Sequence, residues 1–298
     1  MVTGDRYIAA IGNFDGVHRG HQHLLAETIA FARNHGCRPA ALTFDPHPRR
    51  YFRADDAPFL LTAPGLRNDL LRRYGAEKVF ILTFDAALSS QTPETFMAKT
   101  LKDELGLAGV VAGAVFRFGK GRSGGIEALQ TIGEEAGLLV RIAEVVAEEP
   151  FAEKYSSSDA RTAIADGDME RAAHILGRPW TVRGRVADGQ KLGRTLGFPT
   201  ANVTLGDVME PRRGVYATRA IINGKAYNAV SNFGRRPTVG ETAPLLETHL
   251  LDFDGDLYGA DIDIEFIAFL RDEQKFDGLD ALKAAISSDC ELAREILA

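Results

Sequence analysis

Cysteine is almost absent from this chain of 298 residues, which contains only Cys37 and Cys290. The two lie far apart and match none of the short spacings with which cysteines bind metals. Small secreted domains, by contrast, usually depend on several disulfides. The sequence therefore excludes a disulfide scaffold and a cysteine metal site, and it predicts a protein of the reducing cytoplasm.

The chain also lacks an excess of positive charge and long apolar runs. The formal net charge is −6, whereas general binders of nucleic acid or membrane surfaces normally carry a basic patch. No apolar run approaches the roughly 18 residues of a membrane-spanning helix, and Asp5 and Arg6 precede no apolar segment of a signal peptide. We expect no nucleic-acid or membrane partner. Locally placed basic side chains and backbone N–H groups must hold any anionic ligand.

What the chain does contain is enough hydrophobic sequence, 45%, for two packed domains. Its first half alternates strand and helix patterns, which predicts a parallel sheet covered by helices. We expect strands at residues 7–11, 39–44, 78–83 and 109–113, and helices at residues 21–35, 64–74, 93–105 and 126–136.

The pattern changes near residue 180, after two short helical segments at 157–166 and 168–176. Asn-Gly and Asp-Gly pairs then signal hairpins, and short strands without helices between them are typical of an antiparallel barrel or sandwich. We expect strands at 180–186, 214–222, 225–233, 246–251 and 261–270, and a last helix at 278–296. The predicted fold is a Rossmann-like α/β domain over residues 1–178, followed by a small antiparallel β-barrel domain over 179–298 with a C-terminal helix.

The most informative stretch is residues 11–23, where the first strand ends at glycines and a helix begins. His18 and His21 are three residues apart and share a helix face. A helix N-terminus favours anions, and imidazoles there can donate to phosphate oxygens and stabilise charge in a transition state. The stretch predicts a nucleotide-phosphate site made of Gly12, Asn13, Phe14, Asp15, His18 and His21.

Two more loops follow strands and can share the edge of the sheet at which ligands bind. In the first, His47 stands between two prolines, a pattern that by itself favours a rigid loop histidine. The second, residues 113–125, carries Arg117, Lys120 and Arg122 among glycines. It contains a bare G-x-G-x-x-G, but it follows the fourth strand and does not open the fold, so a dinucleotide fingerprint is disfavoured.

Three serines, Ser156, Ser157 and Ser158, precede Arg161 at the start of a helical segment. Serines in this position are typical N-caps. Their hydroxyls could equally donate to a triphosphate, with the arginine fork paired to a phosphate. The residues alone leave both interpretations open.

A second glycine loop contains Gly193 and Gly197 and runs into Thr200 and Asn202. It is not a Walker A loop, because G-K-[ST] is missing at the required spacing. A hydroxyl and an amide are oxygen donors of the kind that Mg²⁺ accepts. Taken alone, the stretch favours a glycine-rich turn entering a strand over a metal site.

Together these stretches resemble the family of bacterial bifunctional riboflavin kinase/FAD synthetases. G-N-F-D-G-V-H-R-G-H is similar to the signature of the HxGH nucleotidyltransferases, and P-H-P, F-R-F-G and Y-S-S-S-D-A-R follow in the family's order. In the second half come G-R-T-L-G-F-P-T-A-N, G-V-Y-A, N-F-G-R-R-P-T, E-T-H-L-L-D and L-R-D-E-Q-K-F. The chain departs from the family's pattern at Val115 (usually Asp or Asn), Ser158 (Thr), Ala160 (Ile) and Phe233 (Ile).

The resemblance, which spans roughly residues 7–297, implies a two-domain transferase. Its kinase domain would convert riboflavin and ATP to FMN. Its nucleotidyltransferase domain would convert FMN and ATP to FAD and pyrophosphate. It implies Mg²⁺, ATP as co-substrate, and FMN and FAD as product and substrate. It also implies a cytoplasmic monomer or weak homo-oligomer whose partners are riboflavin, FMN and ATP. Such adenylylation needs no protein nucleophile, because positioning and charge neutralisation do most of the work.

The resemblance further implies the roles of individual residues. Glu247, by itself an ordinary strand carboxylate, becomes the base that accepts the proton of the riboflavin 5′-hydroxyl, and His18 and His21 become catalytic. Thr200 and Asn202 hold Mg²⁺. Nucleotide binding falls to Gly12, Asn13, Phe14, Asp15, His18, His21, His47, Arg117, Arg122, Ser156, Ser157, Ser158, Arg161, Gly193, Gly197, Thr200 and Asn202, and flavin binding to Phe116, Arg236 and Arg271.

Two other functions remain open on the sequence. The first is a metal-dependent hydrolase, because several side chains of the first half are of types that bind zinc or manganese: Asp15, His18, His21, Asp45 and His47. It leaves the second half unexplained. The second is a flavin-binding protein that has lost one activity, for which Val115 is the sole support.

Overall fold

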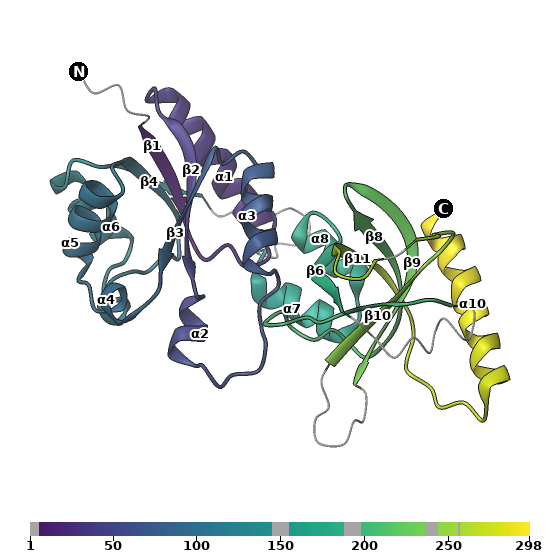
Figure 1. The fold of residues 1–298 in the computed structure, drawn as a ribbon. Coiled ribbons are helices and arrows are strands. Elements are labelled where there is room, and N and C mark those ends of the chain that lie inside the picture. Colours follow the sequence, from purple (N-terminus) through teal and green to yellow (C-terminus); the bar gives the residue numbers. More distant parts are fainter. Residues whose placement is uncertain (1–5, 145–154, 188–197, 236–243, 256) are drawn as a thin grey trace. The chain divides into compact units, whose positions relative to one another are not determined.

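The computed structural model describes residues 6–144, 155–187, 198–235, 244–255 and 257–298 (Figure 1). The chain separates into two compact units, the first made of Met1–Asp56 and Pro64–Ser156 and the second of Ala57–Ala63 and Ser157–Ala298. By compactness, the helices between residues 157 and 178 group with the second unit. The predicted domain limits, 1–178 and 179–298, stay a prediction.

A parallel sheet forms the centre of the first unit, with strand order β3-β2-β1-β4-β5 among the described residues (Figure 1). Its strands are β1 (Tyr7–Ile11), β2 (Arg38–Asp45), β3 (Lys78–Thr83), β4 (Leu107–Gly113) and β5 (Leu139–Ala143). The first-half helices are α1 (Arg19–Asn34), α2 (Pro48–Phe52), α3 (Pro64–Arg73), α4 (Ala86–Ser89), α5 (Pro93–Thr95), η1 (Phe96–Glu104), η2 (Lys120–Arg122) and α6 (Ile126–Glu135).

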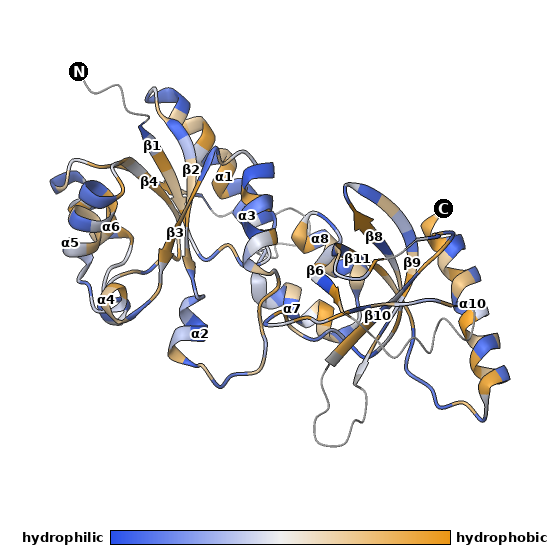
Figure 2. Cartoon of the chain, viewed as in Figure 1, coloured by the Kyte–Doolittle hydropathy of each residue, from blue (hydrophilic) through white to orange (hydrophobic). Residues whose placement is uncertain are grey.

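Each face of this sheet has its own hydrophobic core. Alternate residues of β1 divide between the two cores, Ile8 and Ala10 on one face and Ala9 and Ile11 on the other. Helices α1 and α3 cover the first face, and η1 and α6 cover the second. A strand buried on both faces reads as a continuous apolar run, and Figure 2 shows β1 and β4 as largely hydrophobic.

The predicted strands and longer helices of the first half are confirmed, with ends that differ by a few residues. The fifth strand, β5, was missed. It is a short strand at the end of the sheet, its residues are mostly half-buried, and the charged Arg141 interrupts its apolar run. The short α2 and α4 were missed as well, because each has fewer than two turns and no buried residue to give a periodic signal.

The second unit is a closed antiparallel barrel with strand order β10-β7-β6-β11-β8-β9 in the part of the chain that is described. Its strands are β6 (Trp180–Ala187), β7 (Ala201–Val203), β8 (Gly214–Ile222), β9 (Lys225–Arg235), β10 (Pro244–Leu250) and β11 (Asp261–Arg271). Helices α7 (Ser157–Asp166) and α8 (Met169–Leu176) precede it, and α10 (Leu279–Leu297) ends the chain. The barrel and these helices are confirmed. The three-residue β7 was not among the strands given by range, but it is the strand that the glycine-rich turn before Thr200 was expected to enter.

Segment 57–63 belongs to the barrel unit because its backbone is bonded there. Leu60 N–H donates to the Asp207 carbonyl at 3.1 Å, and Met209 N–H donates to the Leu60 carbonyl at 2.8 Å. The indole N–H of the fully buried Trp180 donates to the Leu61 carbonyl at 2.9 Å. Seven residues of the first half thus complete the packing of the second.

Candidate active sites

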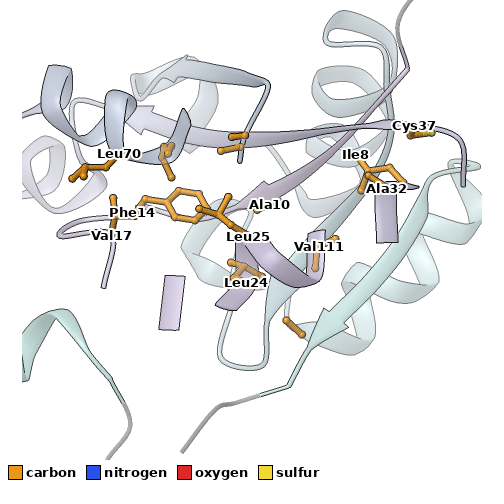
Figure 3. Close-up of a cluster of buried hydrophobic side chains, with 14 of the residues drawn as sticks. Ile8, Ala10, Phe14, Val17, Leu24, Leu25, Ala32, Cys37, Leu70 and Val111 are labelled. Carbon is orange, nitrogen blue, oxygen red and sulfur yellow. The ribbon is translucent and has the colours of Figure 1, made fainter. Parts of the chain in front are cut away.

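The loop after β1 has a backbone conformation that side chains rarely adopt. Phe14 and Val17 have φ of 54° and 43°, and Gly16 has 84°. Such conformations cost free energy and persist only where packing enforces them. Phe14 and Val17 are fully buried among Leu24 and Leu25 of α1 (Figure 3). Buried side chains therefore hold this loop against the start of α1.

Hydrogen bonds from the neighbouring elements fix the same loop. The Thr43 hydroxyl of β2 donates to the Asn13 carbonyl at 3.2 Å, and the Gln22 amide of α1 donates to the Val17 carbonyl at 2.8 Å. Asp15, between these two points, is buried. The backbone and carboxylate of the predicted phosphate loop are thus set before any ligand binds.

His18 and His21 stand together at the N-terminus of α1, as their spacing predicts. Their ring centroids are 3.7 Å apart and nearly parallel, and the Phe14 ring lies 5.2 Å from His21. Burial lowers the pKa of His21 well below its ordinary value of 6.5, and the charge of His18 lowers it further. His21 is therefore neutral at pH 7.

Gly20 lies between the two histidines, where a side chain would have little room. A Cβ atom would lie 3.1 Å from the His18 ring and 3.3 Å from the Tyr155 carbonyl oxygen. The Arg19 guanidinium lies over the Tyr155 ring at 5.8 Å. The chain just before Ser156 thus packs against the N-terminus of α1.

His47 is the N-cap of α2, where its Nδ1 accepts the Arg49 N–H at 3.1 Å. Beyond it stands an aromatic cluster that the sequence analysis did not single out, made of Phe44, Tyr51, Phe52 and Phe84. Its ring centroids are 5.1 to 5.8 Å apart. Phe52 is 68% exposed. A partly exposed aromatic cluster beside the predicted phosphate-binding loop is suited to a planar apolar ring.

The loop after β4 folds back on itself. Phe118 and Gly124 exchange two backbone hydrogen bonds, and Arg117 Nε donates to the Arg122 carbonyl at 3.0 Å. Gly124 is needed because a Cβ there would lie 2.8 Å from the Phe118 ring. Packing thus explains this glycine without a dinucleotide. Val115 is 78% exposed.

The loops after β1, β2 and β4 leave the same edge of the sheet, because these parallel strands are neighbours. We call it the carboxyl edge. Arg67 of α3 reaches it from inside the unit, where its Nη1 donates to the Phe44 carbonyl at 3.1 Å. This arginine was not among the predicted site residues, since its helix position gives no signal beyond a charge in an apolar pattern.

The serine segment is divided between the units, with Ser156 in the first and Ser157, Ser158 and Arg161 in the second. Ser157 begins α7. Arg161 Nε donates to the Phe59 carbonyl at 2.7 Å, and its guanidinium lies 5.6 Å from the Phe59 ring. Within the second unit, Arg161 therefore fastens segment 57–63.

On the barrel, three residues from separate motifs lie in one row across paired strands. Glu247 of β10 is opposite Asn202 of β7 on one side and Asn232 of β9 on the other. Since Leu246 and Thr248 are fully buried, alternation along the strand points Glu247 outward from the barrel. We call Asn202, Glu247 and Asn232 the barrel row.

Asn202 brings an unused acceptor to this row. Its Oδ1 is buried and has no hydrogen-bond partner within the described part of the chain. Such a group is costly unless a ligand, ion or water satisfies it. Next to the row, His249 Nδ1 lies 2.8 Å from the Pro199 carbonyl oxygen, which fixes the chain just before Thr200.

Arg271 is held by the C-terminal helix. It makes a bidentate ion pair with Asp289 of α10, with Nε–Oδ1 and Nη2–Oδ2 distances of 2.8 and 2.7 Å. Gly214 lies close by, where a Cβ would be only 2.3 Å from the Arg271 carbonyl oxygen. The other predicted residues, Gly193, Gly197 and Arg236, lie outside the described residues.

The described residues bear on the alternatives in two respects. The side chains proposed for a hydrolase do not form a metal site, since no group of three or more His, Cys, Asp or Glu side chains there could hold a metal ion. In the same residues, no helix has both the length and the apolar character to cross a membrane.

The two units match two families of transferases that act on nucleotides and flavins. The FAD synthetase family model matches residues 3–159, and the riboflavin kinase family model matches residues 176–297. The bifunctional riboflavin kinase/FMN adenylyltransferase of Pseudomonas fluorescens is 40% identical over 98% of this chain and 93% of its own length. The enzyme of that description from Escherichia coli (strain K12) is 38% identical over 97% and 92%.

The chain therefore belongs to the family of bifunctional riboflavin kinase/FMN adenylyltransferases, and it is an enzyme with ATP and flavins as its substrates. A crystal structure described as a macrolide-efflux protein from Streptococcus pneumoniae has the same fold, with a TM-score of 0.85 and 31% identity over 98% of this chain and 95% of that one. The main prediction is confirmed, and neither the hydrolase nor the protein with one lost activity is favoured.

Proposed function

We propose that the two reactions are divided between the two units, with FMN adenylylation at the carboxyl edge and riboflavin phosphorylation at the barrel row. The observation that carries this proposal is that each family model covers one of two separate sites. The carboxyl edge offers histidines, a helix N-terminus and basic loops. The barrel row offers a carboxylate between two amides.

At the carboxyl edge, a phosphate oxygen of FMN attacks the α-phosphorus of ATP, and pyrophosphate leaves. His18 and His21 donate to phosphate oxygens at the N-terminus of α1, where negative charge is favoured. Neutral His21 has one N–H to donate and stabilises the charge that develops as the leaving oxygen departs. Gly12, Asn13, Phe14 and Asp15 shape the loop.

Other predicted residues of the first unit serve the same phosphates. His47 holds the turn into α2, the exposed Arg117 and Arg122 attract the polyphosphate, and Ser156 contributes a hydroxyl. The nucleotide-binding role of Ser157, Ser158 and Arg161, which belong to the second unit, stays a prediction. The aromatic cluster, with Phe52 exposed, stacks on the isoalloxazine ring, and Phe116 borders it.

At the barrel row, Glu247 accepts the proton of the riboflavin 5′-hydroxyl as that oxygen attacks the γ-phosphorus of ATP, and ADP leaves. The residues fit Mg²⁺, because the buried Oδ1 of Asn202 is an oxygen donor without a partner among the described residues and Thr200 adds a hydroxyl. When bound, the ion would neutralise phosphate charge. Asn232 orients the carboxylate from the neighbouring strand, and Arg271, Arg236 and the loop of Gly193 and Gly197 border the substrates.

We infer a cytoplasmic enzyme, supported by its two free, buried cysteines, Cys37 and Cys290. We infer that its partners are small molecules, without nucleic acid or membrane, and that it is a monomer or a weak homo-oligomer. Sedimentation at several protein concentrations tests the oligomeric state.

A time course with riboflavin, ATP and Mg²⁺, analysed by chromatography, tests the division of labour. FMN should rise first and then pass into FAD. A second reaction that starts from FMN and ATP should yield FAD without the kinase step. Failure to form FMN would contradict the proposed barrel site, and FMN that accumulates without FAD would contradict the proposed carboxyl edge.

A further inference from the structure

Arg67 is an unusual residue for the inside of an α/β unit. It lies on α3 between the sheet-facing residues Leu66 and Leu70, and only 4% of its surface is exposed. Burying a guanidinium costs several kcal/mol unless charges and hydrogen bonds compensate it. A leucine or methionine would fill this place without that cost, so packing alone does not explain an arginine.

The hydrogen bonds of Arg67 do not use all the N–H groups of its guanidinium. Nη1 donates to the Phe44 carbonyl at 3.1 Å, and Nε makes a long contact of 3.3 Å with Asn68 Oδ1. Nη2 is buried and has no partner in the part of the chain that the structure describes. The bond to Phe44 holds the end of β2, from which the loop of His47 begins.

The charges that face Arg67 come from the two loops of the carboxyl edge. Burial lowers its pKa, while the carboxylates of Asp45 and Asp15 act against that shift, in this order of strength. Arg67 stays protonated, because a guanidinium keeps its proton in proteins. Its side chain is thus a permanent positive charge that interacts with the carboxylates of Asp15 and Asp45.

Those two carboxylates present an electrostatic problem for the proposed reaction. FMN and ATP both arrive as polyanions, and the negative charge of these carboxylates would repel them. Asp15 is buried, so water screens it poorly. A cation beneath the loops removes this repulsion without occupying the space of a substrate.

We propose that Arg67 is a positioning residue of FMN adenylylation whose charge offsets Asp15 and Asp45 so that the carboxyl edge accepts its anionic substrates. Its hydrogen bond to Phe44 additionally holds the loop of His47. The inference rests on the proposed site of adenylylation.

Three substitutions separate the charge from the hydrogen bond. Arg67→Gln keeps a donor for the Phe44 carbonyl but removes the charge, Arg67→Lys keeps the charge, and Arg67→Met removes both. Arg73→Met is the matched control, because Arg73 is an exposed arginine on the same helix. The full-length chain is used throughout; riboflavin phosphorylation in the same sample reports whether the barrel unit is folded, and thermal unfolding reports on the first unit.

Initial rates of FAD formation give KM for FMN and ATP. Arg67→Gln should raise both KM values by about tenfold, which corresponds to the loss of about 1.4 kcal/mol of charge interaction. Arg67→Lys should stay within about threefold of the unsubstituted chain, a difference of about 0.7 kcal/mol. Arg67→Met should also lower kcat, since the loop of His47 is released. Adding Asp45→Asn to Arg67→Gln should bring the KM values back down, because the removed charge no longer needs an offset.

Unchanged KM values in Arg67→Gln, or an equal rise in Arg67→Lys, would overturn the inference. So would a double variant no better than Arg67→Gln. Should Arg67→Met lose both activities through misfolding, Arg67→Gln and Arg67→Lys still decide the question. An unsubstituted chain that makes no FAD would instead contradict the proposed site itself.

Discussion

At the carboxyl edge of the sheet the candidate site is carried by loops, whereas on the barrel it is carried by paired strands. In the loop after β1, Phe14, Gly16 and Val17 have a left-handed backbone that the buried side chains of Phe14 and Val17 hold in place. Asn202, Glu247 and Asn232, in contrast, have ordinary extended backbones and meet through strand register. The first site is fixed by packing beneath a strained loop, and the second by hydrogen-bonded neighbours.

This difference predicts different sensitivities. A strand row places its central side chain within reach of both neighbours, so one carboxylate can carry the proton transfer alone. A loop site spreads phosphate binding over many donors, so each donor contributes only part of the effect. Single substitutions should therefore slow riboflavin phosphorylation most when they remove the Glu247 carboxylate. They should slow FMN adenylylation most when they remove a histidine.

Glu247→Gln should have the largest effect. It keeps the size of the side chain and removes the base, so riboflavin phosphorylation should fall by about 10²–10⁴-fold, the usual contribution of a general base. FAD formation from supplied FMN should be unchanged. Chromatography of the two half-reactions measures both rates, and a fully active kinase would remove Glu247 as the base.

His21→Ala should have the next largest effect, at the other site. Removal of one donor to developing negative charge costs about 10²–10³-fold, and FAD formation should fall by that factor. FMN formation by the same sample should be preserved. An equal loss of both activities would contradict the division between the units.

The carboxyl-edge site was easier to predict from the sequence than the barrel row, because one is formed by loops and the other by strand register. The carboxyl-edge site occupies short continuous stretches, so residues 11–23 already predicted the helix start and a shared helix face for His18 and His21, whose rings stack in the structure. Asn232 was quoted only as part of a motif and received no role, because a lone strand asparagine gives no signal. Only its register opposite Glu247 places it in a row.

Other features could not be derived from the sequence because they depend on three-dimensional packing. The exposed Phe52 gathers with rings from both β2 and the end of β3. Segment 57–63 joins the barrel unit through backbone bonds that no residue type specifies. Arg271 has a predicted flavin role that remains a proposal, and its pairing with Asp289 was not foreseen.

Asn232→Ala tests the row itself. Loss of its amide should free the Glu247 carboxylate and slow riboflavin phosphorylation by about tenfold, the factor that corresponds to one hydrogen bond to a charged group. FAD formation should not change. The kinase rate at saturating riboflavin and ATP measures this effect, and an unaltered rate would show that register alone does not define the site.

Ser231→Ala is the matched substitution on the opposite face of the same strand. Inside the barrel, Ser231 Oγ links the Thr218 and Thr248 hydroxyls at 2.8 Å each, and all three residues are fully buried. Its removal leaves hydroxyls unsatisfied and should lower the free energy of unfolding by about 1–3 kcal/mol. Denaturant unfolding measures this loss. KM and kcat of the kinase should stay unchanged, and a change there would mean that the interior also serves the reaction.

The smallest effect concerns the protonation of His21. Because burial and His18 lower its pKa well below 6.5, the free enzyme holds a neutral ring at about pH 6, below the ordinary histidine pKa. The phosphates of ATP favour the protonated form and raise that pKa, so binding should take up a fraction of a proton. Calorimetric titration of ATP in buffers with different ionisation enthalpies measures the uptake. To separate this site from ATP bound elsewhere, His21→Ala serves as the control. Proton uptake that persists in this variant would assign the proton to another group. Loss of the uptake would instead link the lowered pKa of His21 directly to nucleotide binding.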